Sequence, residues 1–454
     1  MILIVVDTLR ADHLSHYGYG RETAAPLDAF RSKSTLFTRA YSTAPWTGPA
    51  TMSILTGLSH LQHRGTGHGD VLSEEVVTLA ERLDAAGYTT HGISFNSEVS
   101  RQTGYAQGFD VFDDFLGDAT DYPDIRQMVR RTAAWLASEP PEPFFLYLQP
   151  MNVHGPYRVP KSRRASFLGY EPGRAFEYYG RDLMAPLMRE GRVELRARVG
   201  EEVVSSLVDQ YDVAVRYSME EVARILAALE AAGALDSSLV VITSDHGEEL
   251  FDHGGFSHGF TLHREVLHVP LYVHLPGQSK PDSIDRPVSL LDLTPTILAR
   301  AGIPTSRDVG QGPGTAEPPT GPMQPTEPSP DLAGIDLFSA AASAAEPRAL
   351  VQHAGWTERA EGLSLILDRD HLIDLEHRYD DPDARVALYD LEGDPAEQKD
   401  RSIDERRETE RLRALLEAEA GRLVKKSGYP EPKNVLDSLD DAATARLRAL
   451  GYVE

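Results

Sequence analysis

Thr47 is the residue of this chain whose surroundings best suit nucleophilic chemistry. It lies in the stretch 41–57, YSTAPWTGPATMSILTG, before a run that favours a helix over residues 50–55, with Pro49 in the first turn and Gly57 at the end. A hydroxyl at a helix N-terminus faces unpaired N–H groups and the positive end of the helix dipole, so an anion that it attacks is also held there. Thr47 could equally be an ordinary cap of this helix.

Two other segments offer ligands for a divalent cation beside Thr47. Asp7 follows the apolar run 2–6, and the pair Asp245 and His246 follows the run 239–243. Two carboxylates, one imidazole and a hydroxyl favour Zn²⁺ or Mn²⁺, with Ca²⁺ and Mg²⁺ as alternatives. A hydroxyl bound to the cation would lose its proton more readily and become a nucleophile near neutral pH. A single Asp after a strand is more often a cap or turn residue, whereas Ser-Asp-His-Gly-Glu after a buried strand is far more specific.

Histidines gather in two glycine-containing segments. His253 and His258 belong to DHGGFSHG, and His154 belongs to NVHGPY. Such loops suit closure over an oxyanion, with each histidine donating an N–H or protonating a leaving alkoxide. We expect this role for His154 and His258, with His253 as a third candidate. We expect His263 and His268 to bond backbone carbonyls.

Asn96 and Arg10 are candidates for binding the substrate. Asn96 lies in the loop after residues 88–94 and could donate a hydrogen bond to a substrate oxygen, although an ordinary loop role fits it equally well. Arg10 lies one turn beyond Asp7 and could pair with that carboxylate or with a substrate oxygen.

Buried strands alternate with helices in the first two thirds of the chain, which predicts a doubly wound, mostly parallel α/β sheet. Short continuous apolar runs are typical of strands covered on both faces, and the C-terminal ends of such strands carry the chemistry. The predicted strands are 2–6, 88–94, 144–148 and 239–243, with a passage from helix to strand at 264–273, and the predicted helices are 74–86, 125–137, 203–232 and 290–301.

The composition divides the chain into three parts. Residues 1–303 are expected to form the main α/β domain. Residues 304–332 are rich in Pro, Gly, Thr and Glu without a periodic apolar face, which indicates a flexible linker or long surface loop. Residues 333–454 are expected to form a smaller α+β unit, with strands at 363–367, 371–375 and 386–391 and an amphipathic helix at 406–424.

The bulk properties exclude several classes of protein. The 454 residues carry a formal charge of −25, which argues against a nucleic-acid-binding surface and leaves a local metal or Arg/His cluster to attract an anionic substrate. The absence of cysteine excludes disulfides, thiolate catalysis and Cys-ligated zinc.

No apolar run approaches the roughly 20 residues that span a bilayer. Residues 1–6 do not resemble a secretory leader, so we expect a cytoplasmic protein, or a periplasmic or secreted one if a leader has been lost. Nothing in the sequence indicates an oligomeric state.

Several segments together resemble the sulfatase family within the alkaline-phosphatase superfamily. They occur in the order expected for that family and cover nearly the whole chain. The resemblance implies a phosphatase-like α/β domain, a small C-terminal sheet domain and one divalent cation at the nucleophile. The segments are VVDTLRADHLSHYGY, TGPATMSILTG, GFDVFDD, HGPY, TSDHGEELFDHGGFSHG, YDLEGDPAEQ and RLRALGYV.

The resemblance also implies roles for individual residues. By motif, Thr47 matches the family's nucleophile. Asn96, His154 and His258 fall where the family holds the oxygens of the ester or assists the leaving group. The family's metal ligands are matched by Asp7, Asp245 and His246.

The segment around Thr47 departs from the family pattern. In sulfatases this position is a Cys or Ser that is converted to formylglycine within the signal C/S-x-P-S-R. Here Pro49 remains, whereas Ala50 and Thr51 replace the Ser and Arg. Formylglycine hydrate eliminates sulfate from a hemiacetal, but threonine has no second hydroxyl on that carbon. An ester on Thr47 would therefore need attack by water, and phosphoryl intermediates are the better precedent, since threonine is the nucleophile in related nucleotide pyrophosphatases and phosphoethanolamine transferases.

Two further departures concern the metal. Thr8 stands where the family has a second Asp, which removes one hard oxygen ligand and again favours Mn²⁺ or Zn²⁺ over Ca²⁺. Pro150 stands where a two-metal phosphatase would have an Asp before His154. We therefore expect one metal ion.

The sequence favours a metal-dependent hydrolase that cleaves a phosphate mono- or diester or a phosphonate ester of a small molecule through a covalent Thr47 intermediate. A sulfate-ester hydrolase is the nearer alternative by sequence. A transferase, in which an alcohol resolves the intermediate, is another. A catalytically silent sulfatase-like binding protein is favoured by the altered segment around Thr47 and opposed by the retained acidic and histidine residues.

Overall fold

A nine-stranded, mostly parallel sheet forms the centre of the described part of the protein. The computed structural model describes residues 1–114, 123–169, 183, 199–304, 332–339, 342, 347–355, 362–375, 386–426, 429–430 and 432–434. The order along the sheet is β11-β2-β10-β7-β1-β6-β4-β5, and β12 also pairs with β2. The strands are β1 (Ile2–Val5), β2 (Thr35–Tyr41), β4 (Thr89–Ser94), β5 (Val111–Asp114), β6 (Phe144–Gln149), β7 (Val240–Thr243), β10 (His268–His274), β11 (Asp282–Ile284) and β12 (Val288–Ser289).

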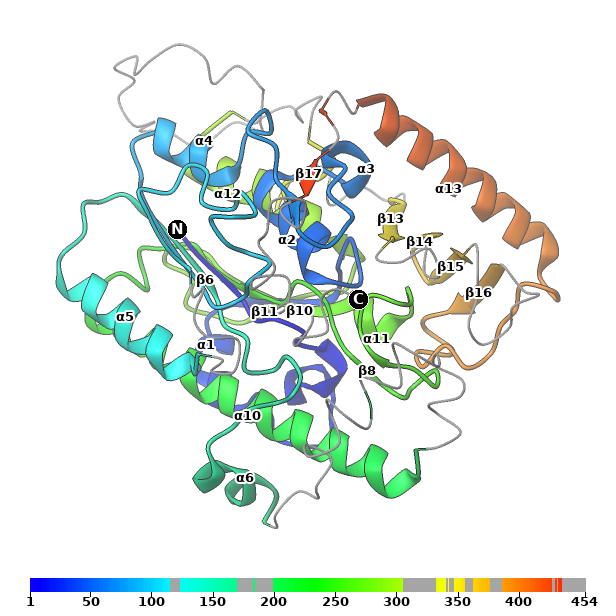
Figure 1. The fold of residues 1–454 in the computed structure, drawn as a ribbon, viewed down its shortest axis with the longest axis horizontal. Coiled ribbons are helices and arrows are strands. Elements are labelled where there is room, and N and C mark those ends of the chain that lie inside the picture. Colours follow the sequence, from blue (N-terminus) through cyan, green and yellow to red (C-terminus); the bar gives the residue numbers. More distant parts are fainter. Residues whose placement is uncertain are drawn as a thin grey trace.

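Helices cover both faces of this sheet, as Figure 1 shows. Alternate residues of β1 enter different cores: Ile2 and Ile4 pack on one side, and Leu3 and Val5 on the other. The first core contains α5 (Ile125–Ala137) and α10 (Glu201–Ala231). The second core contains α2 (Thr47–Thr56), α4 (Leu79–Ala85) and α12 (Leu293–Ala301). The layered arrangement confirms the predicted doubly wound fold.

Short elements connect these layers. They are the 3₁₀ helices η1 (Ala11–His13), η2 (Ser15–Tyr17), η3 (Ala25–Leu27) and η5 (Leu290–Asp292), the helices α1 (Asp28–Arg31), α3 (His60–His63), α6 (Lys161–Leu168) and α11 (Arg264–Leu267), and the short strand pairs β3 (Asp70–Val71) with β17 (Lys433–Asn434) and β8 (Glu249–Leu250) with β9 (Phe256–Ser257).

A smaller antiparallel sheet follows in the C-terminal part and confirms the predicted second sheet. We call it the C-terminal sheet. One face packs on the long helix α13 (Arg406–Lys426), seen in orange-red in Figure 1. The other face shares a core with Tyr41 and with α11 of the main part. Its strands, in order, are β13 (Leu350–Ala354), β14 (Gly362–Leu367), β15 (Asp370–Leu375) and β16 (Val386–Asp390).

The structure differs from the expected elements in several places. The helix expected from residue 74 begins only at Leu79, because Thr78 and Glu81 form a capping box there. Strands β2, β5 and β13 were not predicted, and β10 runs antiparallel to both of its neighbours. Most of the expected linker 304–332 and the closing segment 446–453 lie outside the described residues.

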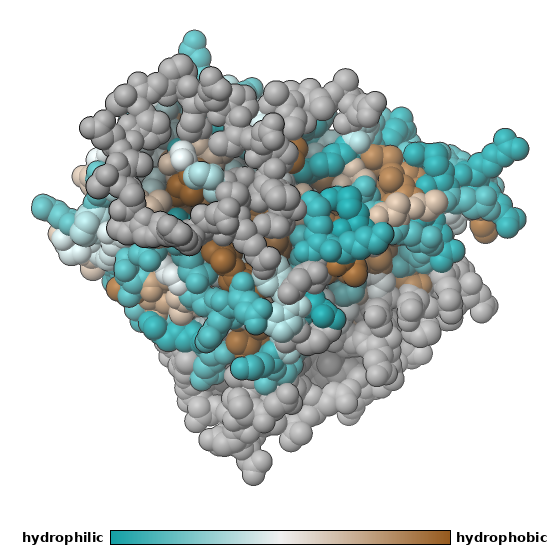
Figure 2. Space-filling model, turned by 90° about the horizontal axis from the view of Figure 1, so that it is seen from above, coloured by the Kyte–Doolittle hydropathy of each residue, from teal (hydrophilic) through white to brown (hydrophobic). Residues whose placement is uncertain are grey.

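Hydrophilic side chains cover most of the described part of the face in Figure 2, with smaller hydrophobic areas between them. Of the helices that the structure describes, none has both the length and the apolar character needed to cross a membrane.

Candidate active site

Three distant segments meet at the C-terminal edge of the central sheet. Asp7 follows β1, Asp245 and His246 follow β7, and Thr47 begins α2. Single ligand atoms of Asp7, Asp245 and His246 lie within 4.8 Å of one another. The Thr47 hydroxyl donates towards Asp7 Oδ2 at 3.5 Å and lies 3.2 Å from His246 Nε2. The structure therefore brings together the residues that the sequence suggested for one cation.

The register of two strands explains why the carboxylates meet. β1 and β7 are parallel neighbours in which Val5 lies opposite Thr243, so the residues after them leave the sheet at the same level. Asp245 accepts hydrogen bonds from the main-chain N–H of Thr8 at 3.3 Å and from Gln149 Nε2 at 3.4 Å. These bonds fix the orientation of one of the two carboxylates.

Thr47 is the first residue of α2 but does not cap it. The N-cap position is Trp46, and no side chain caps this helix end. Gly48 is required here, because a Cβ atom would lie 2.8 Å from the Trp46 ring. Gly57 ends the helix as predicted, with a φ of 68°. The Thr47 hydroxyl is thus used for contacts with the carboxylate and imidazole of the site and not for capping.

The buried carboxylates of Asp7 and Asp245 would be stabilised by a cation between them. Asp7 and Asp245 are both fully buried, at 0% exposure. Burial, and after it the charge of Asp245, holds the pKa of the Asp7 carboxyl well above its usual range. The Asp7 Oδ1 atom has no hydrogen-bond partner among the described residues. Adjacent buried carboxylates without a counter-charge are unfavourable, so the donor set and the orphaned oxygen fit a divalent cation.

Asn96 lies against the same group. Its Nδ2 donates to Asp7 Oδ2 at 2.5 Å and to Thr47 Oγ1 at 3.3 Å. Its Oδ1 accepts the main-chain N–H of Glu98 at 2.8 Å. The amide is therefore oriented from both ends, and it holds the carboxylate beside the Thr47 hydroxyl.

Three imidazoles line one side of the site. The ring centroids of His246 and His258 are 4.6 Å apart, and those of His258 and His154 are 5.0 Å apart. Burial lowers the pKa of each of the three to about 4. Neutral imidazoles can accept a proton or donate a single N–H, as the leaving oxygen of an ester requires.

Glu248 is a residue of this site that our sequence interpretation missed. Its Oε1 accepts a hydrogen bond from His258 Nδ1 at 2.9 Å, and its side chain is fully buried. Burial raises the pKa of this carboxyl to about 7. Its place two residues after His246 in SDHGEEL was the available signal, since a second acidic residue after a buried strand rarely serves the core.

Arg10 makes its side-chain contacts with other partners. Its guanidinium donates to Asp12 and Asp252, with closest distances of 2.8 Å to each, and to the Glu248 carbonyl at 3.0 Å. Among the described residues, none of its side-chain hydrogen bonds goes to Asp7. The arginine thus supports the segment that carries Glu248.

The other three histidines considered in the sequence analysis also bond to protein groups. His253 contacts Glu265 and the Glu397 carbonyl, at the boundary with the C-terminal part. His268 bonds the Thr38 carbonyl at 2.8 Å, as expected. His263 bonds the Glu397 carboxylate at 2.9 Å and not the expected backbone carbonyl.

Comparison with known protein families and sequences identifies sulfatases as relatives of this chain. A family model described as Sulfatase matches residues 1–303. An arylsulfatase of Clostridium perfringens is 25% identical over 377 residues, which are 67% of this chain and 76% of the relative.

Solved structures share the fold over nearly the whole chain. A phosphonate monoester hydrolase of Agrobacterium radiobacter superimposes with a TM-score of 0.67 at 18% identity, covering 94% of both chains. A 2-O GAG sulfatase gives a TM-score of 0.69 at 19% identity, covering 97% of this chain and 94% of that chain. At these identities the likeness establishes the fold.

Proposed function

Because the chain belongs to the sulfatase family, whose matched relatives are ester hydrolases, we propose that it hydrolyses a phosphate mono- or diester or a phosphonate ester through a covalent intermediate on Thr47. The observation that carries this proposal is the position of the Thr47 hydroxyl, 3.5 Å from Asp7 Oδ2 and 3.2 Å from His246 Nε2. The substrate is a small anionic ester. Residues 1–303 form the catalytic domain, 304–332 a linker, and 333–454 the C-terminal subdomain.

One divalent cation would complete the site. Asp7, Asp245 and His246 would hold it together with the Thr47 oxygen, with Mn²⁺ or Zn²⁺ favoured by the mixed oxygen and nitrogen donors. When bound, such an ion lowers the pKa of a hydroxyl and neutralises charge on the ester oxygens. The amide of Asn96 holds Asp7 in place for this task.

Thr47 is the nucleophile in the first half of the reaction. Its Oγ forms a bond to phosphorus, while the bond from phosphorus to the leaving oxygen breaks and the hydroxyl proton passes to water. The start of α2 supports this step, because its unpaired N–H groups stabilise negative charge at that end of the helix.

His258 and His154 lie on the side of the site where the leaving oxygen of the ester would depart. With the anionic ester bound, the carboxylate of Glu248 stabilises the protonated form of His258, which gives its proton to the leaving oxygen. His154 keeps its Nδ1–H on the Gly155 carbonyl at 2.7 Å, so its Nε2 accepts a hydrogen bond on this side of the site. In the second half, water attacks the same phosphorus, His258 takes the proton of this water, and the bond from phosphorus to Thr47 Oγ breaks. Thr47 Oγ then regains a proton from solvent. The enzyme returns to its starting state with phosphate or phosphonate released.

Sulfate-ester hydrolysis is the second candidate, favoured by the arylsulfatase relative and by the family itself. Thr47 makes this reaction less favourable, because the Cβ atom of threonine carries a single hydroxyl and a sulfate ester on it cannot be released by elimination. Release of sulfate would need attack of water on the sulfur of a threonine sulfate.

Chromogenic phosphate monoesters, phosphate diesters, phosphonates and sulfates, each assayed with Mn²⁺, Zn²⁺, Mg²⁺ and Ca²⁺, test the proposal. We expect turnover of a phosphorus ester that falls at least about 1,000-fold in Thr47→Ala and in Asp245→Ala. Intact mass after rapid quench should show phosphate or phosphonate on Thr47 of the wild type. Turnover of sulfates alone would replace the proposal by the second candidate. Absence of turnover with every metal would favour a silent binding protein.

Thr47→Ser is the matched variant for the nucleophile. It keeps the hydroxyl and removes only a methyl group, so it should retain substantially more activity than Thr47→Ala. Equal activity of Thr47→Ala and wild type would exclude a covalent route through this residue.

A further inference from the structure

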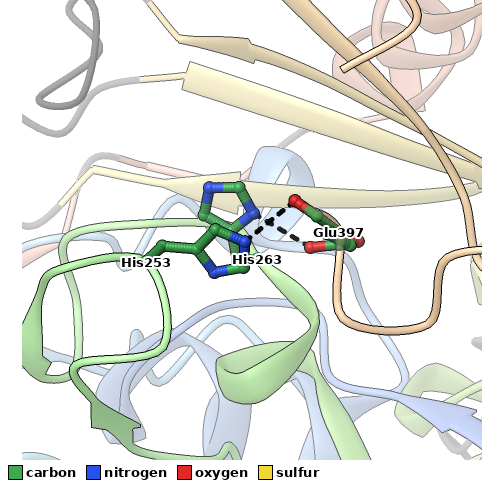
Figure 3. A group of neighbouring side chains, drawn as sticks. All are labelled: His253, His263 and Glu397. Atoms are coloured by element: carbon green, nitrogen blue, oxygen red, sulfur yellow. Dashed lines mark hydrogen bonds and ion pairs between the residues drawn. The ribbon is translucent and has the colours of Figure 1, made fainter. Parts of the chain in front are cut away.

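Glu397 joins the C-terminal part to the main part through two histidines, His253 and His263, and also contacts His371 of its own part. Figure 3 shows its carboxylate facing His263, with His253 stacked on that ring. Oε2 of Glu397 accepts a bond from His263 Nδ1 at 2.9 Å, and Oε1 accepts one from His371 Nδ1 at 2.5 Å. The Glu397 carbonyl accepts a bond from His253 Nε2 at 3.0 Å. We call this group, completed by the main-chain N–H of Arg264 at 2.9 Å from Oε2, the Glu397 clasp.

The side chains of the Glu397 clasp have the composition of a metal site, but their geometry is that of a hydrogen-bonded group. The rings of His253 and His263 are stacked at 3.7 Å with an angle of 5° between them. Ring-nitrogen lone pairs lie in the ring planes, so lone pairs in two parallel planes do not converge on one ion. The second nitrogen of His253, Nδ1, is bonded to Glu265 at 2.6 Å.

The clasp holds both ends of one loop. His253 and His263 stand at the two ends of segment 253–263, and His258 lies midway between them. Gly259 of this segment donates its N–H to the Pro45 carbonyl at 2.9 Å, beside the Thr47 segment. A loop fixed at both ends and at its centre presents its middle residue in a single place.

Charge and backbone conformation indicate that Glu397 is held in place firmly. It is 1% exposed, and its φ of 53° is unusual for a non-glycine residue. Burial alone would raise the pKa of this carboxyl, but the charge of His371 and the hydrogen bond of His263 outweigh burial and hold the pKa well below its usual range. The clasp is therefore built around an ionised carboxylate, and charge-assisted bonds of this kind are the stronger ones.

We propose that Glu397 is a positioning residue for catalysis, because it fixes segment 253–263 and thereby the place of His258 beside His246. The C-terminal part then belongs to the machinery of the active site although it supplies no residue to the reacting atoms. This inference rests on the proposed function for the role of His258, whereas the anchoring of the loop stands on the contacts alone.

The test compares the wild type with Glu397→Gln and with Asp368→Asn. Asp368 is the matched control, since its exposed carboxylate lies 3.5 Å from Arg39 of the main part and does not contact the loop. Both variants convert one carboxylate of the C-terminal part into an amide. Hydrogen–deuterium exchange of peptides from residues 251–263 is the first measurement, and it does not depend on activity.

We expect faster exchange of the loop in Glu397→Gln, with β1 and β7 unchanged, and wild-type exchange in Asp368→Asn. Turnover of two esters of the same acid is the second measurement. Because His258 protonates the leaving oxygen, Glu397→Gln should lower kcat for a poor leaving group at least about 10-fold more than for 4-nitrophenol, with little change in KM. A merely structural loss of folded protein would lower both rates equally.

Unchanged loop exchange in Glu397→Gln, or equal losses on the two esters, would overturn the inference. If Glu397→Gln does not fold, His263→Gln, which removes one bond of the clasp, takes its place with the same expected outcome. A wild type that turns over no ester would refute the proposed function of the site. The exchange measurement alone would then test whether Glu397 anchors segment 253–263.

Discussion

Glu248 accepts a hydrogen bond from His258 at 2.9 Å between Oε1 and Nδ1, and both side chains are buried. This bond places the proton of a neutral His258 on Nδ1 and leaves Nε2 for another partner. A carboxylate behind an imidazole also stabilises the imidazolium that forms when Nε2 takes a proton, as in the serine hydrolase triad. The pair thus explains how a histidine in a glycine-rich loop can have a defined orientation.

Glu248→Gln should lower kcat about 100-fold for an ester with a poor leaving group. The amide can still accept the bond from Nδ1, but it cannot balance the charge of a protonated His258. An ester of 4-nitrophenol is the internal control, because its leaving oxygen needs little protonation and its rate should fall far less. Equal losses on both esters would show that Glu248 supports the fold and not the proton transfer.

Removal of the cation should lower stability as well as activity. We expect one divalent ion per chain by elemental analysis and a fall in Tm of several degrees with a chelator, because an ion that binds only the folded state at about 100 times its Kd stabilises by about 3 kcal/mol. Asp245→Asn should bind no ion and show no effect of the chelator. Asp368→Asn should behave like the wild type in both measurements. Retention of the ion in Asp245→Asn would contradict the ligand set.

The sequence was sufficient to predict the centre of the site because the ends of parallel strands meet at one edge of a sheet. Asp7 and Asp245 each follow a continuous apolar run, so the fold class places both at the same edge of the sheet, and the pairing of β1 with β7 brings them together. The direction of β10 could not be predicted in this way. The run HVPLYVH is apolar when read in either direction, and only its partners in space decide that it lies antiparallel to β7 and β2.

Side-chain partners from distant segments were the part that could not be predicted. His253 and His258 share one glycine-rich segment, and no periodicity in that loop distinguishes the histidine beside His246 from the one that meets the C-terminal part. Only the resemblance to the family favoured His258, and nothing indicated the partners of His253. The distinction comes from Glu397, which is far away in the sequence, and from Glu248. A loop that turns through several residues with positive φ, among them Phe251 and Ser257, has no regular inward face to read.

A second group of histidines at the boundary of the two parts predicts a loss of stability in acid. The rings of His60 in α3 and His353 in β13 stack with centroids 4.6 Å apart, and His63 follows in the same helix. Burial lowers the pKa of His60 well below its usual range, that of His63 to about 3 and that of His353 to about 4. Neither ring nitrogen of His60 has a hydrogen-bond partner among the described residues.

His60→Phe should therefore gain stability relative to the wild type as the pH falls. In the unfolded chain a histidine takes up a proton near pH 6.5, but the folded state keeps His60 neutral, so its contribution to stability is present above that pH and is lost below it. Thermal unfolding between pH 7.5 and pH 5 should show this difference as a Tm advantage of His60→Phe that grows towards acid. The comparison at pH 7.5 isolates the effect of the larger ring on packing. If the Tm of the two proteins falls equally with pH, His60 is protonated in the folded state, and the contact between α3 and β13 does not limit stability in acid.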